Sequence, residues 1–135
     1  EWTVGGPTAD CGLTGRKIVC DQYGGYTPVG GGAFSGKDPT KVDRSAAYMA
    51  RHLAKFVVKK LGAAHCLIQL GYVIGKTEPV SVEVSTGDKA LDELASKTIS
   101  DNFDLRPKAI IDRLDLLNAD YERIAEGCHY YGIDW

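Results

Sequence analysis

Residues 30–62 read GGGAFSGKDPTKVDRSAAYMARHLAKFVVKKLG, a glycine-rich loop that runs into a long helix. Asp38 can cap this helix, Pro39 fits its first helical position, and Gly62 can end it. Apolar residues recur between these ends at spacings of three and four, which predicts an amphipathic helix with one buried face. The apolar positions are Ala46, Met49, Ala50, Leu53, Phe56, Val57 and Leu61. The basic residues expected mainly on the opposite, solvated face are Arg44, Arg51, Lys55 and Lys59.

Outside this helix the sequence predicts two strands and two shorter helices. Residues 66–74 and 80–85 are rich in aliphatic and β-branched residues, and the segment 75–79 between them is a turn. Helical spacing follows over residues 89–101 and again from Pro107 to Leu114. This order predicts an α+β fold in which helices pack on one face of a mainly antiparallel or mixed sheet.

The first third of the chain is dominated by turns. Glycine and proline make residues 5–15 a loop, residues 16–21 form a short β-prone run, and residues 22–38 are too rich in glycine for regular structure. A loop of that length in a small domain is usually functional or disordered.

The composition of the chain excludes some classes of function. The chain has 135 residues, of which 44% are hydrophobic and 25% charged, as expected for one ordinary globular domain. Its net charge of -2 gives no support for nucleic-acid binding, and no apolar run approaches the length of a membrane span.

The four cysteines show no metal-ligand spacing with one another or with a histidine. Their number is low for a small secreted domain, so we expect reduced, mostly buried thiols in a cytoplasmic protein. The chain begins with Glu1 rather than methionine and stops without a polar tail, so we expect it to be part of a longer protein.

The glycine-rich loop and the helix after it suggest a polyphosphate site. Glycines allow close approach of the backbone to an anion, and a helix start favours negative charge. Lys37 and Lys41 are then candidate phosphate ligands, and Asp43 is a candidate Mg²⁺ ligand. Arg16 and Lys17 follow a second glycine turn and are further candidates.

Two other interpretations compete with this one. Gly31, Gly36 and Lys37 have most of the P-loop spacing, but Asp38 stands where that motif has serine or threonine, which argues against it. All of these cations are also compatible with an ordinary solvated surface, and spacing alone does not decide between a ligand and a surface role.

Three segments carry a resemblance to a known family. Residues 5–17, 30–48 and 102–107 resemble S-adenosylmethionine synthetase (methionine adenosyltransferase), and the likeness extends over nearly the whole chain. It implies that residues 1–135 are the C-terminal portion of a longer, multi-domain enzyme with a synthetase-like α+β fold.

The resemblance implies a reaction in which the methionine sulfur attacks the ribose C5′ of ATP and displaces the triphosphate, which is then hydrolysed to phosphate and diphosphate. A sulfur nucleophile needs no general base, so orientation and charge stabilisation are the main tasks. The substrates would be ATP and L-methionine, the cofactors Mg²⁺ and K⁺, and the assembly a homodimer or homotetramer with shared sites.

The same resemblance implies roles for single residues. Arg16, Lys17 and Lys37 would contact the phosphates as catalytic residues, and Lys41 would lie near phosphate and methionine. Asp43 would hold Mg²⁺, and Asp10 would bind the methionine amino group or the nucleoside. Trp2 would stack on adenine, with Ile74 on the other side of the base.

Two departures from the family limit what this chain does alone. The family's N-terminal segments, which bring further ligands, are absent, so we expect the isolated chain to be inactive. Residues 126–132 also depart from the usual Tyr-Gly-His-Phe-Gly pattern. An alternative is therefore a non-catalytic assembly or regulatory module that docks onto a full-length synthetase, and a third is an unrelated phosphate-binding domain.

Overall fold

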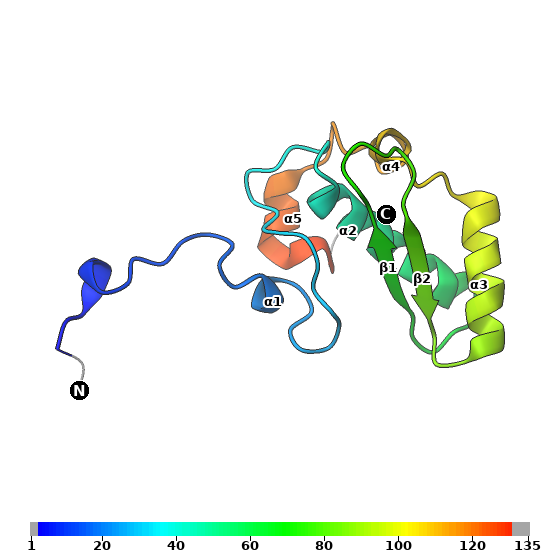
Figure 1. The fold of residues 1–135 in the computed structure, drawn as a ribbon, viewed down its shortest axis with the longest axis horizontal. Helices are drawn as coiled ribbons and strands as arrows, with labels where there is room; N and C mark the ends of the chain where they lie inside the picture. Colours follow the sequence, from blue (N-terminus) through cyan, green and yellow to red (C-terminus); the bar gives the residue numbers. More distant parts are fainter. Residues whose placement is uncertain (1–2, 131–135) are drawn as a thin grey trace.

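A computed structural model describes residues 3–130 of the chain (Figure 1). A short helical turn, η1 (Gly6–Thr8), and the one-turn helix α1 (Ile18–Asp21) precede the long helix α2 (Val42–Leu61). Two strands follow, β1 (Leu67–Gly71) and β2 (Ser81–Ser85). The remaining elements are α3 (Lys89–Asn102), α4 (Pro107–Arg113), α5 (Tyr121–Gly127) and η2 (Cys128–Tyr130).

Strands β1 and β2 form an antiparallel pair, with Leu67 opposite Ser85 and Gly71 opposite Ser81. Helix α2 packs against β1, α3 packs against β2, and α4 packs against α2 (Figure 1). The predicted α+β class is therefore confirmed, with a sheet of two antiparallel strands in the described residues.

The core is built around α2. Its side chains Tyr48, Met49, Leu53 and Val57 are at most 1% exposed. They meet buried residues of α3, α4 and the segments between the helices, chiefly Ala95, Ile99, Phe103, Leu105, Ile110, Leu114 and Leu116. Each large apolar side chain buried in this way contributes about 1.5–3 kcal/mol to folding. Helix α2 is thus the element on which the other elements are assembled.

The end of α2 is as predicted, whereas its start is not. Gly62 ends the helix in the left-handed conformation, with φ of 73°. At the other end Lys41 precedes the first helical residue, because the Asp38 carboxylate accepts a 2.9 Å hydrogen bond from the Thr40 backbone N–H and holds residues 38–40 in a turn. Asp38 therefore does not cap the helix as expected.

The N-terminal part also differs from the sequence prediction. Residues 18–21 form the helical turn α1 instead of a strand, closed by a 2.9 Å bond from the Asp21 N–H to the Lys17 carbonyl. No strand of the described residues pairs with this segment, so the β-prone side chains have no ladder to join. Residues 3–17 form a largely exposed arm, most of which extends away from the rest (Figure 1).

The expectation of mostly buried cysteines is wrong for the described thiols. Cys11 and Cys20 are exposed, Cys66 is half-buried, and all three are free. The exposed pair belongs to the arm and α1, which the core does not cover. No helix within residues 3–130 combines the length and apolarity that crossing a bilayer requires.

We expect Gly62→Ala to lower the free energy of unfolding by about 1 kcal/mol, because an L side chain is strained at a φ of 73°. No described atom lies within 4 Å of the added methyl group, so backbone strain is the whole cost. Gly25→Ala is the matched control, since its surroundings are equally open and its φ is not in the left-handed region. Urea denaturation measures both variants, and equal stabilities would contradict this role of Gly62.

Candidate functional site

An ion pair lies where the glycine-rich loop meets α2. The Lys37 Nζ is 2.6 Å from Oδ2 of Asp43, which occupies the first turn of the helix. The side chains are only 26% and 43% exposed. Lys37 itself follows a tight turn in which its N–H donates to the Phe34 carbonyl at 3.1 Å. The structure therefore brings together two of the residues predicted to bind triphosphate and metal.

Glycine backbone covers this pair closely. A Cβ on Gly31 would lie 2.9 Å from Oδ1 of Asp43 and 3.3 Å from its Cα, and the φ of Gly31 is 70°. A Cβ on Gly32 would lie 2.9 Å from the Lys37 Nζ. Because side chains at these positions would press on the pair, the two glycines let main chain rather than side chain face Lys37 and Asp43.

Arg44 holds the other side of Lys37. Its Nη1 donates to the Lys37 carbonyl at 2.9 Å, and its Nε donates to the Tyr48 hydroxyl at 2.8 Å. Its guanidinium carbon is 4.3 Å from the ring centroid of Tyr121 on α5. We expected Arg44 on the solvated face of the helix, but it is half-buried. The spacing of four between Arg44 and Tyr48 on one helix was the available signal for this contact.

Lys41 is close to Lys37 in the sequence but makes different contacts. Its Nζ lies 3.6 Å from Oδ2 of Asp38, and both side chains are more than half exposed. Hydrogen bonds from Thr40, with the charge of Lys41 as a smaller cause, hold the pKa of Asp38 below its usual value. Lys41 is thus paired with Asp38 at the solvent-exposed start of α2.

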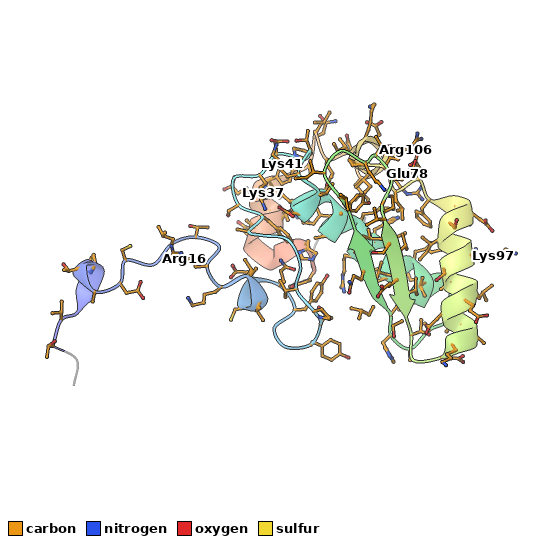
Figure 2. All side chains as sticks on the ribbon, viewed as in Figure 1. Arg16, Lys37, Lys41, Glu78, Lys97 and Arg106 are labelled. Atoms are coloured by element: carbon orange, nitrogen blue, oxygen red, sulfur yellow. The ribbon has the colours of Figure 1, made fainter. Side chains whose placement is uncertain are left out.

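The other predicted residues are not gathered at this pair. Arg16 and Lys17 are exposed at the end of the arm, and Figure 2 shows Arg16 well apart from Lys37 and Lys41. Asp10 accepts a hydrogen bond from the Gly12 N–H at 3.1 Å. Ile74 is fully exposed between β1 and β2, and Trp2 lies outside the described residues.

One contact links the arm to the glycine-rich loop. A Cβ on Gly15 would lie 2.2 Å from the Cβ of Ala33, so the two backbones approach as closely as glycine permits. Arg16 follows directly in the chain. The arm therefore passes the loop that carries Lys37 before it reaches α1.

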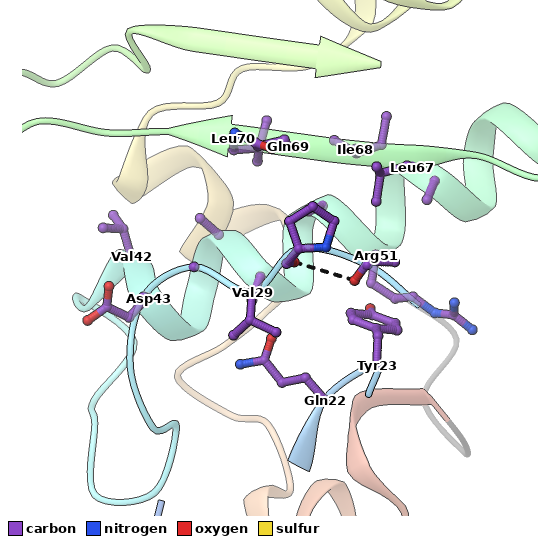
Figure 3. Close-up of a pocket in the computed structure, with 18 of the residues that line it drawn as sticks. Gln22, Tyr23, Val29, Val42, Asp43, Arg51, Leu67, Ile68, Gln69 and Leu70 are labelled. Carbon is purple, nitrogen blue, oxygen red and sulfur yellow. Dashed lines mark hydrogen bonds between the residues drawn. The ribbon is translucent and has the colours of Figure 1, made fainter. Parts of the chain in front are cut away.

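A cleft of about 400 Å³ opens beside the pair, between residues 22–31, α2 and β1 (Figure 3). The α2 face toward it carries small side chains, Ala46, Ala47, Ala50 and Ala54. Asp43 lies at one end of the cleft and Arg51 at the other (Figure 3). The small side chains leave space between the helix and the loop, and Asp43 lines one end of that space.

The family model for the S-adenosylmethionine synthetase C-terminal domain matches residues 4–134. The chain belongs to this family. The resemblance carried by the glycine-rich motifs is confirmed, and the P-loop interpretation fails on geometry as well, because in this synthetase domain α2 starts at Val42 and not at the lysine.

The family implies metal ions, and the synthetase domain supplies little to hold them. Within residues 3–130 no three His, Cys, Asp or Glu side chains are arranged to bind a metal ion. Asp43 offers a single carboxylate, and Lys37 already neutralises it at 2.6 Å. Mg²⁺ needs a shell of oxygen ligands, so the described residues do not by themselves form its site.

A buried histidine ties the start of the loop to the C-terminal part of the domain. His129 is 3% exposed, and its Nε2 is 3.0 Å from the Tyr23 hydroxyl. The rings of Phe34, Tyr48 and Tyr130 lie 5.6, 5.4 and 4.6 Å from it between centroids. Burial, with the charge of Arg51 as a lesser cause, lowers the pKa of His129 to about 4. No sequence pattern signalled this contact, because 106 positions separate the two residues.

The depressed pKa of His129 predicts lower stability in acid. The unfolded imidazole binds its proton near pH 6.5 and the folded one near 4, so the stabilisation is complete above 6.5 and is lost as pH falls toward 4. The difference between the two pKa values corresponds to about 3 kcal/mol in the free energy of unfolding. We expect urea midpoints of His129→Gln to depend less on pH than those of the natural protein. The exposed His65→Gln is the control, and a wild-type pH slope in His129→Gln would contradict the assignment.

Proposed function

We propose that this domain supplies part of the ATP and methionine site of an S-adenosylmethionine synthetase. The reaction joins the methionine sulfur to C5′ of the ATP ribose, breaks the C5′–O bond and releases triphosphate, which is hydrolysed to phosphate and diphosphate. Membership of the family supports the reaction class. The Lys37–Asp43 pair beneath Gly31 and Gly32 is the observation that supports this part of the domain as the site.

The pair suits a leaving group that carries several negative charges. Phosphate oxygens compete with Asp43 for the Lys37 ammonium, and a lysine acts on phosphate as a compact point charge. Glycine backbone beside the ammonium lets an anion approach without a side chain in the way. Lys37 would then stabilise charge that develops as the C5′–O bond breaks.

The other residues proposed to bind substrate belong to the N-terminal segment and to the loop between β1 and β2. Arg16 and Lys17 would contact the phosphates once the arm meets the rest of the site, and Lys41 would lie near phosphate and methionine. Asp10 would bind the methionine amino group or the nucleoside, and Trp2 and Ile74 would enclose the adenine. The arm exposes Val4 and Leu13 as well as these cations, by 53% and 61%. Apolar side chains on an extended segment support contact with a second copy, in a homodimer or homotetramer.

We further propose Mg²⁺ and K⁺ as cofactors of the whole enzyme, with Asp43 as one Mg²⁺ ligand. Because the described residues do not complete either site, we assign no step to either ion. The exposed free thiols of Cys11 and Cys20 favour a reducing compartment and so the cytoplasm.

A second candidate function is a non-catalytic module that docks onto a longer synthetase chain. The observation in its favour is that Lys37 and Asp43 already satisfy one another at 2.6 Å, so neither needs a substrate. In that case Lys37 would be dispensable for activity, whereas the exposed arm would be needed for association.

We expect Lys37→Ala to lower S-adenosylmethionine formation by about 10²–10³-fold, the usual cost of removing one group that stabilises transition-state charge. The assay uses the natural full-length protein with ATP, methionine, Mg²⁺ and K⁺. Lys97→Ala is the matched control, because Lys97 is an exposed lysine of α3, far from Lys37 in Figure 2.

Two results would overturn the enzymatic proposal. Absence of product from the natural protein would exclude the reaction. Full activity of Lys37→Ala, together with co-purification of the domain with a longer synthetase, would favour the docking module.

A further inference from the structure

We propose that Arg44 is a positioning residue, which aims the Lys37 ammonium by fixing the main chain of Lys37 and transmits the placement of α5 to the anion site. This inference rests on the proposed function of Lys37. Arg44 is not assigned a contact with substrate, so its role is distinct from that of the phosphate-binding residues.

Three contacts hold the Arg44 guanidinium in place. Nη1 donates to the Lys37 carbonyl at 2.9 Å and Nε to the Tyr48 hydroxyl at 2.8 Å, both within the plane of the guanidinium. The guanidinium carbon lies over the Tyr121 ring, 4.3 Å from the ring centroid. A planar group with two directed hydrogen bonds and an aromatic ring against it has little freedom to rotate.

The two tyrosines that contact Arg44 are themselves held by further contacts. Tyr48 is 1% exposed, and its ring is 5.5 Å from that of Phe34 between centroids. The Tyr121 hydroxyl donates to the Leu116 carbonyl at 2.6 Å, and Leu116 is fully buried. Arg44 therefore connects the core and the start of α5 to a loop residue that regular secondary structure does not hold.

Lys37 needs this support because of its position. It lies in an irregular segment, five residues before α2, and its side chain reaches forward across that gap to Asp43 in the first turn of the helix. A carbonyl held by Arg44 fixes the peptide plane after Lys37, and so limits the directions that its Cα–Cβ bond can take. Misplacing a reacting or stabilising group by about 1 Å is enough to cost about 100-fold in rate.

Lysine cannot replace Arg44 in this role. A lysine ammonium is a point donor on a flexible stem, without a planar fork that reaches a carbonyl and a hydroxyl while its face covers a ring. We expect Arg44→Lys to lower kcat by about 10–100-fold and to change the KM for methionine little. The matched control is Arg123→Lys, at an exposed arginine of α5.

Chemical rescue separates positioning from a general structural role. We expect millimolar guanidinium to restore part of the kcat of Arg44→Ala in the full-length protein, because the ion can occupy the vacated place between Tyr48, Tyr121 and the Lys37 carbonyl. The same guanidinium should not raise the kcat of Lys37→Ala. Thermal melting of each variant reports whether it is folded.

If an Arg44 variant does not fold, variants of Tyr121 test the same connection from α5 through Arg44 to Lys37. Tyr121→Phe keeps the ring under the guanidinium and Tyr121→Leu removes it, so we expect kcat to fall further in the leucine variant. Wild-type kcat in Arg44→Lys, no rescue of folded Arg44→Ala, or equal kcat in the two Tyr121 variants would overturn the positioning role. If the natural protein forms no S-adenosylmethionine, the proposed function itself fails, which is a different outcome.

Discussion

The burial of one face of α2 is the constraint on which the rest of the structure depends. Tyr48, Met49, Leu53 and Val57 are held in the core, so the rotation of the helix about its axis is fixed. Asp43 and Arg44 belong to the first turn of the same helix and take their directions from that packing. The packing that forms the core therefore also places the Asp43 carboxylate beside the Lys37 ammonium and the Arg44 guanidinium beside the Lys37 carbonyl.

The irregular loop before α2 is shaped by contacts at both of its ends. At its end, the Lys37–Asp43 ion pair and the Arg44 hydrogen bond hold Lys37. At its start, the hydroxyl of Tyr23 meets the buried His129 of the C-terminal region. Glycines between these points adopt backbone conformations and close approaches that side chains would prevent. A loop without regular structure can therefore present a defined surface to an anion.

Local sequence signals predicted most of the elements, whereas particular side-chain contacts and strand pairing decided the rest. Gly62, Pro107 and the apolar spacing of α2 marked helices correctly, because caps and periodicity act within a few residues. The start of α2 and the helical turn at residues 18–21 were missed, because a side-chain turn at Asp38 and the absence of a described partner strand decided them. In the site, the glycine motif indicated Lys37 and Asp43, whereas the contact of Arg44 with Tyr121 joins segments far apart in the chain.

We infer that the Lys37–Asp43 pair is the resting form of a triphosphate site. A crystal structure of the natural protein grown with tripolyphosphate tests it most directly. We expect the Lys37 Nζ to leave Asp43 and contact a phosphate oxygen, with the main chain of Gly31 and Gly32 facing the same anion. Tripolyphosphate bound elsewhere, with the Lys37–Asp43 contact still at 2.6 Å, would contradict the claim.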